Sequence, residues 1–109
     1  MNAGERRALW HYRLRCYRII GTNVRAGRNE LDLIVRRGST LLFVEVKQRS
    51  GQGFGGPLAA VDVEKRRRVR RAAQAWLVRN PQRPGVRIGF EVVAVQGRDL
   101  ERRATSLEP

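Results

Sequence analysis

The fold of this chain is decided by residues 29–49, which read Asn-Glu-Leu-Asp-Leu-Ile-Val-Arg-Arg-Gly-Ser-Thr-Leu-Leu-Phe-Val-Glu-Val-Lys-Gln-Arg. Two apolar runs flank Gly38-Ser39, a dipeptide that suits the centre of a two-residue hairpin loop with Gly at the first position of a type II′ turn. The stretch therefore predicts two antiparallel strands joined by a tight turn.

Charged residues stand in these two strands, where a buried strand would carry none. With a two-residue loop, Asp32 faces Glu45 across the ladder. Glu30 then faces Lys47, and all four side chains share one face because they alternate with a period of two. A loop longer by one residue would oppose Asp32 to Val44, and a loop longer by two would oppose Glu30 to Glu45. The face assignment therefore survives only even changes in loop length.

Two opposed carboxylates repel each other at Cβ separations of about 4.5 to 5.5 Å. A divalent cation held between Asp32 and Glu45 by oxygen ligands would remove this repulsion, and the backbone carbonyl of Val46 could add a third ligand. Lys47 is near enough to orient an attacking water or to neutralise developing negative charge. These residues predict a Mg²⁺ (or Mn²⁺) site suited to phosphodiester hydrolysis.

The composition limits the size of the fold and the kind of partner. The 109 residues suffice for one domain with a single modest core. Lys and Arg number 23 against 10 acidic residues, which gives a formal net charge of +13. This excess predicts a polyanionic partner, most simply nucleic acid, and the alternative is a solvated basic surface. No segment pairs a basic helical face with an exposed apolar one, so we expect no membrane partner.

Cys16 is the single cysteine, so the sequence has neither a disulfide framework nor a cysteine-rich zinc site. Its place on a helical stripe predicts a buried, inert thiol. The first residues lack the apolar segment of a signal peptide, and no apolar run is long enough to span a membrane. We therefore expect a cytoplasmic protein.

A helix is predicted over residues 4–16, because one face carries the stripe Glu5, Leu9, Tyr12 and Cys16. Glu5 is the carboxylate at the start of this packing stripe. It either complements the helix dipole in the first turn or belongs to the functional site.

A three-stranded antiparallel meander follows, formed by Tyr17 to Arg25, the strand that carries Asp32, and Thr40 to Gln48. The core face of the two later strands is predicted to hold Leu31, Leu33, Val35, Leu42, Val44 and Val46. Leu41 and Phe43 share the opposite face with Glu45, so that face must also be covered.

Residues 49–60 contain four glycines around Gln52 and Phe54, a composition typical of a mobile loop. The loop leaves directly from the strand that carries Glu45. It either covers a bound nucleic acid, with Phe54 stacked on a base, or is a plain connector with Phe54 packed inward.

A second helix is predicted with Asp62 as its cap, Glu64 in its first turn and Asn80-Pro81 at its end. Its apolar stripe consists of Val69, Ala72, Ala73, Trp76 and Leu77. Six of the seven residues from Lys65 to Arg71 are basic.

Like charges in one run destabilise a helix, and a phosphate backbone would relieve their repulsion; the alternative is a solvated face. Lys65 falls within the apolar stripe, so its stem would lie on the sheet and its head group would point toward one sheet edge. The predicted nucleic-acid contacts are Arg49, Phe54, Lys65, Arg66, Arg67, Arg68, Arg70 and Arg71.

Val86 to Val95 alternates apolar residues on both faces, as a buried strand would. A strand, a helix and a strand in one sheet imply a right-handed crossover, so this strand should lie parallel to the one that carries Glu45 and beside it. From Gly97 onward we expect an irregular or frayed tail. The sequence thus predicts an α/β fold with the first helix packed on a mixed sheet, a single domain over residues 1–97 and a polar tail over residues 98–109.

The order of these residues resembles the PD-(D/E)xK motif of restriction-endonuclease-like nucleases, with Asp32 followed by Glu45-Val46-Lys47. More closely, the chain resembles the bacterial YraN-like family, which is similar to archaeal Holliday-junction resolvases. The resemblance covers about residues 4 to 95 and is carried by Gly4-Glu5, Asn23-Val24-Arg25, and residues 29–34, 43–49 and 61–67.

This resemblance implies a restriction-endonuclease-like sheet and a metal-dependent endonuclease acting on DNA, with branched or structured duplexes among its substrates. It implies that Asp32, Glu45 and Lys47 are catalytic and adds Glu5 as a further acidic member. Glu30 and Gln48 would be accessory residues. Because junction resolvases pair two active sites, a homodimer is also expected. The alternative is a nucleic-acid-binding module that does not cut, in which the carboxylates form structural ion pairs such as Glu30 with Lys47.

Overall fold

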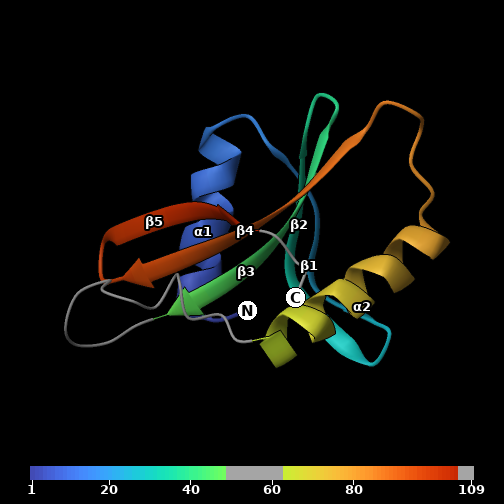
Figure 1. Cartoon of the computed structure of the whole chain (residues 1–109). Coiled ribbons are helices and arrows are strands. Elements are labelled where there is room, and N and C mark those ends of the chain that lie inside the picture. The colour runs from blue at the N-terminus through green and yellow to red at the C-terminus, as the bar shows by residue number, and fades with distance from the viewer. Residues whose placement is uncertain (49–62, 106–109) are drawn as a thin grey trace.

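The computed structural model describes residues 1–48 and 63–105, which form one mixed five-stranded sheet with two helices (Figure 1). The sheet order follows the sequence, β1-β2-β3-β4-β5. The elements are α1 (Ala3–Leu14), β1 (Arg18–Ala26), β2 (Asn29–Arg37), β3 (Thr40–Gln48), α2 (Val63–Arg79), β4 (Arg87–Gln96) and β5 (Asp99–Thr105).

The predicted hairpin register is confirmed near the turn. β2 and β3 pair antiparallel from Leu33 with Val44 to Arg37 with Thr40, which leaves Gly38 and Ser39 as the two loop residues. Gly38 has a φ of 58°, a conformation that glycine adopts without the steric cost borne by other residues. The backbone pairing of β2 with β3 ends at Leu33 and Val44, so it does not extend to Asp32 and Glu45.

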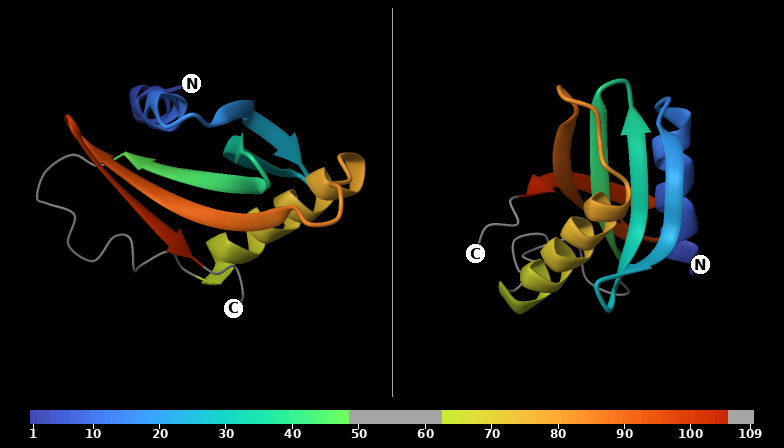
Figure 2. Two further views of the ribbon diagram at one scale, coloured as in Figure 1. Left: turned by 90° about the horizontal axis from the view of Figure 1, so that it is seen from above. Right: turned by 90° about the vertical axis from the view of Figure 1, so that its right-hand side faces the viewer.

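The two helices cover opposite faces of the sheet (Figure 2). On the α1 face, one core cluster joins Ala8 and Tyr12 to residues of β2, β3 and β4. On the α2 face, a second cluster joins Ala72 and Ala73 to Leu41 and Phe43. Both faces of β3 are therefore buried, as predicted, and the stripe predicted for the second helix is the face of α2 that packs on the sheet.

One predicted core position is wrong. Leu31 belongs to the cluster under α2, whereas Leu33 and Val35 pack on the α1 side. The regular alternation is therefore interrupted between Leu31 and Leu33, and Asn23, which lies opposite this part of β2, has a φ of 48° rather than an extended value.

β4 runs parallel to β3 from Arg87 beside Thr40 to Val95 beside Gln48, which confirms the predicted neighbour and direction. The expectation of an irregular tail from Gly97 is wrong for residues 99–105, which form β5. Gly97, with a φ of 59°, and Arg98 form a two-residue turn, and Gln96 then pairs with Asp99. Residues 106–109 lie outside the described residues.

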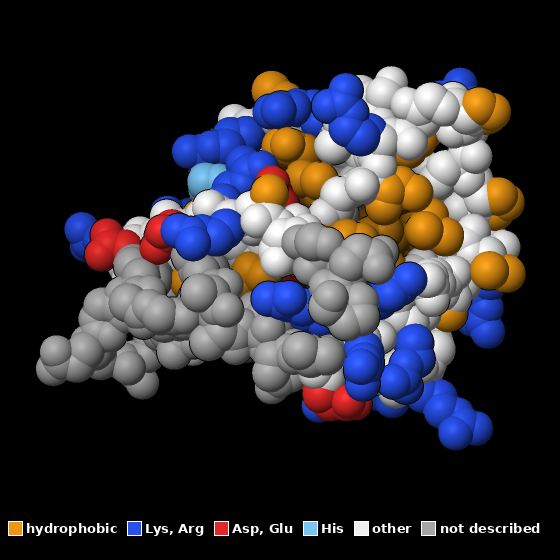
Figure 3. All heavy atoms as spheres, in the orientation of Figure 1, with side chains coloured by type: hydrophobic (Ala, Val, Ile, Leu, Met, Phe, Trp, Pro, Cys, Tyr) orange, Lys and Arg blue, Asp and Glu red, His pale blue; other side chains and the backbone are white. Residues whose placement is uncertain are grey.

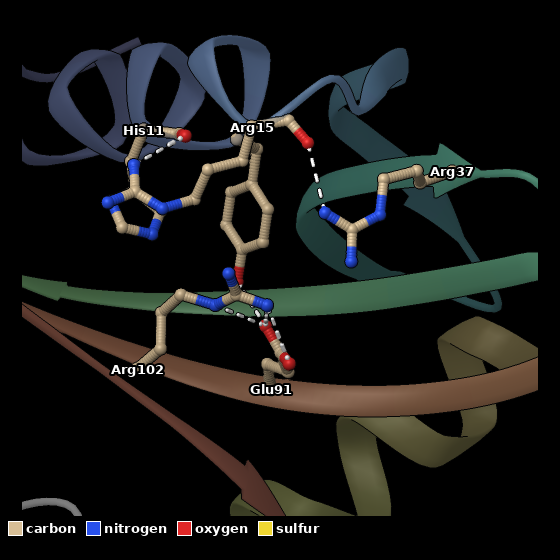
Figure 4. A network of polar contacts seen from close by, with 6 residues as sticks. His11, Arg15, Arg37, Glu91 and Arg102 are labelled. Carbon is tan, nitrogen blue, oxygen red and sulfur yellow. Dashed lines mark hydrogen bonds and ion pairs between the residues drawn. The ribbon is translucent and has the colours of Figure 1, made fainter.

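Polar contacts hold β5 and α1 to β4 (Figure 4). Glu91 of β4 forms a bidentate ion pair with Arg102, with N–O distances of 2.9 and 3.0 Å. The Tyr12 hydroxyl donates to the same carboxylate at 2.5 Å, and burial raises the pKa of this phenol far above its usual range. The Arg102 guanidinium also lies over the Tyr12 ring, 4.7 Å from its centroid. The ion pair with Glu91 thus gives the polar strand β5 a charge-assisted contact with β4.

The predicted burial of Cys16 is also wrong, because its thiol is exposed. The helix ends at Leu14, earlier than the stripe suggests, and Cys16 lies in the turn to β1 with a φ of 67°. A residue in that conformation no longer continues the helical face, so its side chain leaves the stripe.

Candidate functional site

The predicted carboxylates converge at the end of the sheet where β2 and β3 cease to pair. Oxygen atoms of Glu5, Glu30 and Asp32 lie within 4.8 Å of one another. Asp32, Glu30 and Glu45 line a pocket of about 230 Å³ together with residues from the start of α2. We call it the acidic pocket, and its full lining is Asn29, Glu30, Asp32, Glu45, Lys65, Arg68 and Val69.

Glu5 reaches this cluster from the first turn of α1. Its side chain is nearly buried, with 8% exposed, and forms a capping box with Asn2. The backbone N–H of Gly4 donates to the Gln48 side chain at the end of β3 at 3.0 Å, which ties the start of the helix to this strand. A Cβ at Gly4 would stand 2.9 Å from the same amide oxygen, so glycine permits this close approach. Glu5 thus caps the first turn of α1 and also lies close to the carboxylates of Glu30 and Asp32.

Asp32 is held by the backbone of the neighbouring strand, since the Val46 N–H donates to its Oδ2 at 2.8 Å. This side chain takes the place of a ladder hydrogen bond where the strands separate. The pKa of Asp32 is raised to about 7, first by burial and then by the negative charges of Glu45 and Glu5, while the hydrogen bond from the Val46 N–H opposes the shift. The raised pKa therefore reflects burial first and neighbouring negative charge second.

Glu45 is paired with the basic helix. Its Oε1 lies 2.6 Å from the Lys65 Nζ, and the exposed fractions of the two side chains are 12% and 42%. The Lys65 head group was predicted to point toward a sheet edge; in the structure its partner is Glu45 on β3, the central strand of the sheet. Arg68, one turn further along α2, also lines the pocket.

The other predicted residues are spread around this site. Lys47 is half-buried on β3, and its predicted pairing with Glu30 stays a prediction. On α2, Arg67, Arg70 and Arg71 line a separate surface pocket. Figure 3 shows Lys and Arg side chains gathered near the N-terminal part of α2. Arg49, Phe54 and the Asp62 cap lie outside the described residues.

Asn23 is a site residue to which the sequence argument gave no role. Its Nδ2 donates to Glu5 at 3.2 Å and to Glu30 at 3.0 Å, so one amide joins carboxylates from α1 and β2. The signal for it was weak: an Asn inside a strand, the residue type that best tolerates a positive φ apart from glycine.

An oxygen-rich cluster of this kind fits a hard divalent cation. Carboxylate and carbonyl oxygens are the ligands that Mg²⁺ and Mn²⁺ prefer, and oxygens of Glu5, Glu30 and Asp32 lie within 4.8 Å of one another here. Neither of the two described helices combines the length and the apolar content needed to cross a membrane.

Comparison with known proteins identifies the family. Residues 4–95 match "Uncharacterised protein family UPF0102". A UPF0102 protein of Alkalilimnicola ehrlichii is 41% identical over 96 residues, which cover 88% of this chain and 76% of the relative. One from Methylobacterium nodulans is 39% identical over 111 residues, covering 99% and 84%, and one from Methylorubrum extorquens is 42% identical over 100 residues, covering 92% and 77%. This chain therefore belongs to the UPF0102 family, the YraN-like family that its motifs resemble.

Proposed function

We propose that this protein is a divalent-metal-dependent endonuclease that hydrolyses phosphodiester bonds in DNA, with branched or otherwise structured duplexes as its substrates. The observation that carries the proposal is the acidic cluster, in which carboxylate oxygens of Glu5, Glu30 and Asp32 lie within 4.8 Å of one another beside Glu45. Such a concentration of negative charge opposes DNA binding unless it serves a cation. The restriction-endonuclease-like arrangement of the sheet is part of the same proposal.

The residues in and around the acidic pocket have separate tasks in this proposal. Asp32 and Glu45, with the backbone carbonyl of Val46, would hold Mg²⁺ or Mn²⁺, and Glu5 would be a further carboxylate ligand. When bound, the cation neutralises charge on the scissile phosphate and lowers the pKa of a water. The Lys47 ammonium would orient that water or stabilise negative charge on the phosphate oxygens. Asn23 would fix the two outer carboxylates through its amide.

The basic helix supports DNA as the substrate. The first turns of α2 carry six basic residues between Lys65 and Arg71, of which Lys65 and Arg68 line the acidic pocket. Together with the net charge of +13, they would offset the repulsion between the pocket and a phosphate backbone. A homodimer would supply the two active sites that cleavage of a branched junction requires.

The test is a cleavage assay with Mg²⁺ or Mn²⁺ on four-way junctions, linear duplexes and single strands. Asp32→Asn should lower the rate at least about a hundredfold, because it removes one charge from the cluster and preserves the shape of the side chain. Asp99→Asn makes the same change on β5, outside the pocket, and should cleave as the wild type does. Absence of cleavage of every DNA form, or equal cleavage by the Asp32 variant, would refute the proposal.

The second candidate is a nucleic-acid-binding module that does not cut. The ion pair between Glu45 and Lys65 favours it, because a carboxylate that already has a partner at 2.6 Å is stabilised without a metal. Lys65→Met separates the two candidates in Mn²⁺ titration calorimetry. If Glu45 is a metal ligand, the variant binds Mn²⁺ more tightly than the wild type. If it is structural, neither protein binds Mn²⁺, with or without DNA, and the variant is simply less stable.

A further inference from the structure

A second charged feature lies at the turn end of the β2–β3 hairpin, away from the acidic pocket. Four arginines, Arg18, Arg36, Arg37 and Arg83, line a cavity of about 420 Å³ there. An adjoining cavity of about 300 Å³ is also lined by Arg36 and Arg83. No Asp or Glu lines either cavity in the described part of the chain. We call this feature the arginine pocket.

Two of these arginines are held in place by uncharged partners. Arg36 donates to the Gly38 carbonyl at 3.1 Å and to the Gln82 side chain at 3.4 Å. Arg37 donates to the Arg15 carbonyl at 3.0 Å (Figure 4) and lies over the Tyr17 ring, 4.4 Å from its centroid. A guanidinium has five N–H donors, so these contacts fix its orientation and leave donors for an anion.

The other two arginines differ from these in their polar contacts. Among the described residues, the side chains of Arg18 and Arg83 form no hydrogen bond and no ion pair. Four positive charges therefore line one cavity, and its lining contains no carboxylate from residues 1–48 or 63–105. An arginine fork matches the oxygens of a phosphate in geometry as well as in charge, so a phosphate is the ligand that this arrangement suits.

The arginine pocket and the acidic pocket both include residues of β2, and this strand gives the distance between them. Arg36 follows Asp32 by four residues on β2, which corresponds to about 13 Å along an extended strand. A duplex advances 3.4 Å per base pair, so this distance spans about four base pairs. α2 links the two ends, because Lys65 near its start pairs with Glu45 and Gln82 just beyond its end bonds to Arg36.

We propose that the arginine pocket binds a backbone phosphate of the bound DNA, about four base pairs to one side of the acidic pocket. The identity of the ligand rests on the proposed function, whereas the anion-binding character of the pocket does not. The pocket would fix the distance between the protein and the scissile bond, and it would require a minimum length of DNA on that side.

Fluorescence anisotropy on a series of labelled duplexes, in EDTA to prevent cleavage, tests this proposal. The informative variant is Arg18→Gln/Arg83→Gln, because neither side chain has a hydrogen bond or ion pair to lose within the described part of the chain. At 0.1 M salt we expect its affinity for long duplexes to fall about tenfold or more, and the slope of log K against log salt to fall by about 1 to 2. For duplexes too short to span both pockets, the loss should disappear.

Arg98→Gln/Arg103→Gln is the matched control, since it removes the same charge from exposed positions at β5, outside the arginine pocket. If the pocket variant binds every duplex as this control does, or if its loss does not depend on duplex length, the proposal is wrong. The cleavage assay on Asp32→Asn is independent of this result. If the pocket variant loses affinity in a length-dependent way but the wild type does not cleave DNA, the arginine pocket stands and the nuclease proposal fails. If the wild type cleaves DNA but the pocket variant keeps its affinity, the nuclease proposal stands and the arginine pocket fails.

Discussion

Asp32→Asn should stabilise the metal-free protein at neutral pH and leave it unchanged in acid. The pKa of Asp32 is about 7 in the folded chain, against 3.8 for a free side chain. Between these values the folded state binds a proton that the unfolded state has released, so this group lowers stability as the pH rises from about 4 to about 7. Asn cannot ionise, and its side-chain oxygen can still accept the hydrogen bond from the Val46 N–H.

The size of the effect follows from the pKa. One unit corresponds to about 1.4 kcal/mol, so the whole shift sets an upper limit of about 4 kcal/mol. Asp32 is only half-buried and solvent screens its charge, so we expect about 2 kcal/mol in practice. The variant and the wild type should then unfold alike near pH 4 and differ by about 2 kcal/mol at pH 7.5 and above.

Urea denaturation at pH 4, 5.5 and 7.5 in EDTA measures the difference directly, with Asp99→Asn as a control that should match the wild type throughout. Mn²⁺ supplies a second readout. If the pocket holds the ion, the wild type gains stability at pH 7.5 as the ion concentration rises, and Asp32→Asn gains much less. A difference that does not depend on pH, or a variant less stable than the wild type at pH 7.5, would refute the reasoning.

Three other substitutions or reagents test the fold. Glu91→Gln weakens the contacts with Tyr12 and Arg102. Urea denaturation should show a free energy of unfolding about 2 to 3 kcal/mol lower than that of the wild type. A loss below about 0.5 kcal/mol would show that these contacts do not stabilise the fold. Gly27→Val forces a branched residue to a φ of 55° and places its Cβ 3.2 Å from a backbone carbonyl of α2. This strain should lower the free energy of unfolding by about 2 kcal/mol or more. An unchanged melting temperature would contradict the turn geometry. The Cys16 thiol should react with a disulfide reagent in the native protein, and a reaction that needs denaturant would contradict its exposure.

The hairpin was predictable because its register depends on local chemistry. Gly38-Ser39 fixes a two-residue loop, and once the loop length is set, the pairing of Leu33 with Val44 follows. The parallel placement of β4 was also predictable, because a strand, a helix and a strand in one sheet leave few other connections. These features are determined by short stretches of sequence and by general rules of chain topology.

β5 could not be found in this way, because its sequence is polar and its stability depends on partners far along the chain. Arg102 joins the sheet through Glu91 and the Tyr12 ring, contacts that no local pattern announces. Cys16 was misplaced for a related reason. The helical stripe continues on paper to this residue, whereas the chain turns toward β1 after Leu14.

The candidate site was predictable in its members and less so in its geometry. The alternation of side chains and the motif spacing selected Asp32 and Glu45, and the packing stripe selected Glu5. The pairing of Glu45 with Lys65 and the bridge made by Asn23 depend on how α2 and α1 pack on the sheet. Such contacts join segments distant in sequence, and periodicity carries no information about them.

Glu5 both closes the first turn of α1 and belongs to the acidic cluster, so ligand binding at the cluster would affect the stability of the helix end. Its Oε1 accepts a hydrogen bond from the N–H of Asn2, which closes the first turn of α1, and the same oxygen accepts one from the side chain of Asn23 on β1. Any cation that attracts this carboxylate competes with the N-terminal amide for it. Occupancy of the pocket and fraying of the helix end would thus be thermodynamically linked, and hydrogen exchange at the first amides of α1 would report on the site from outside it.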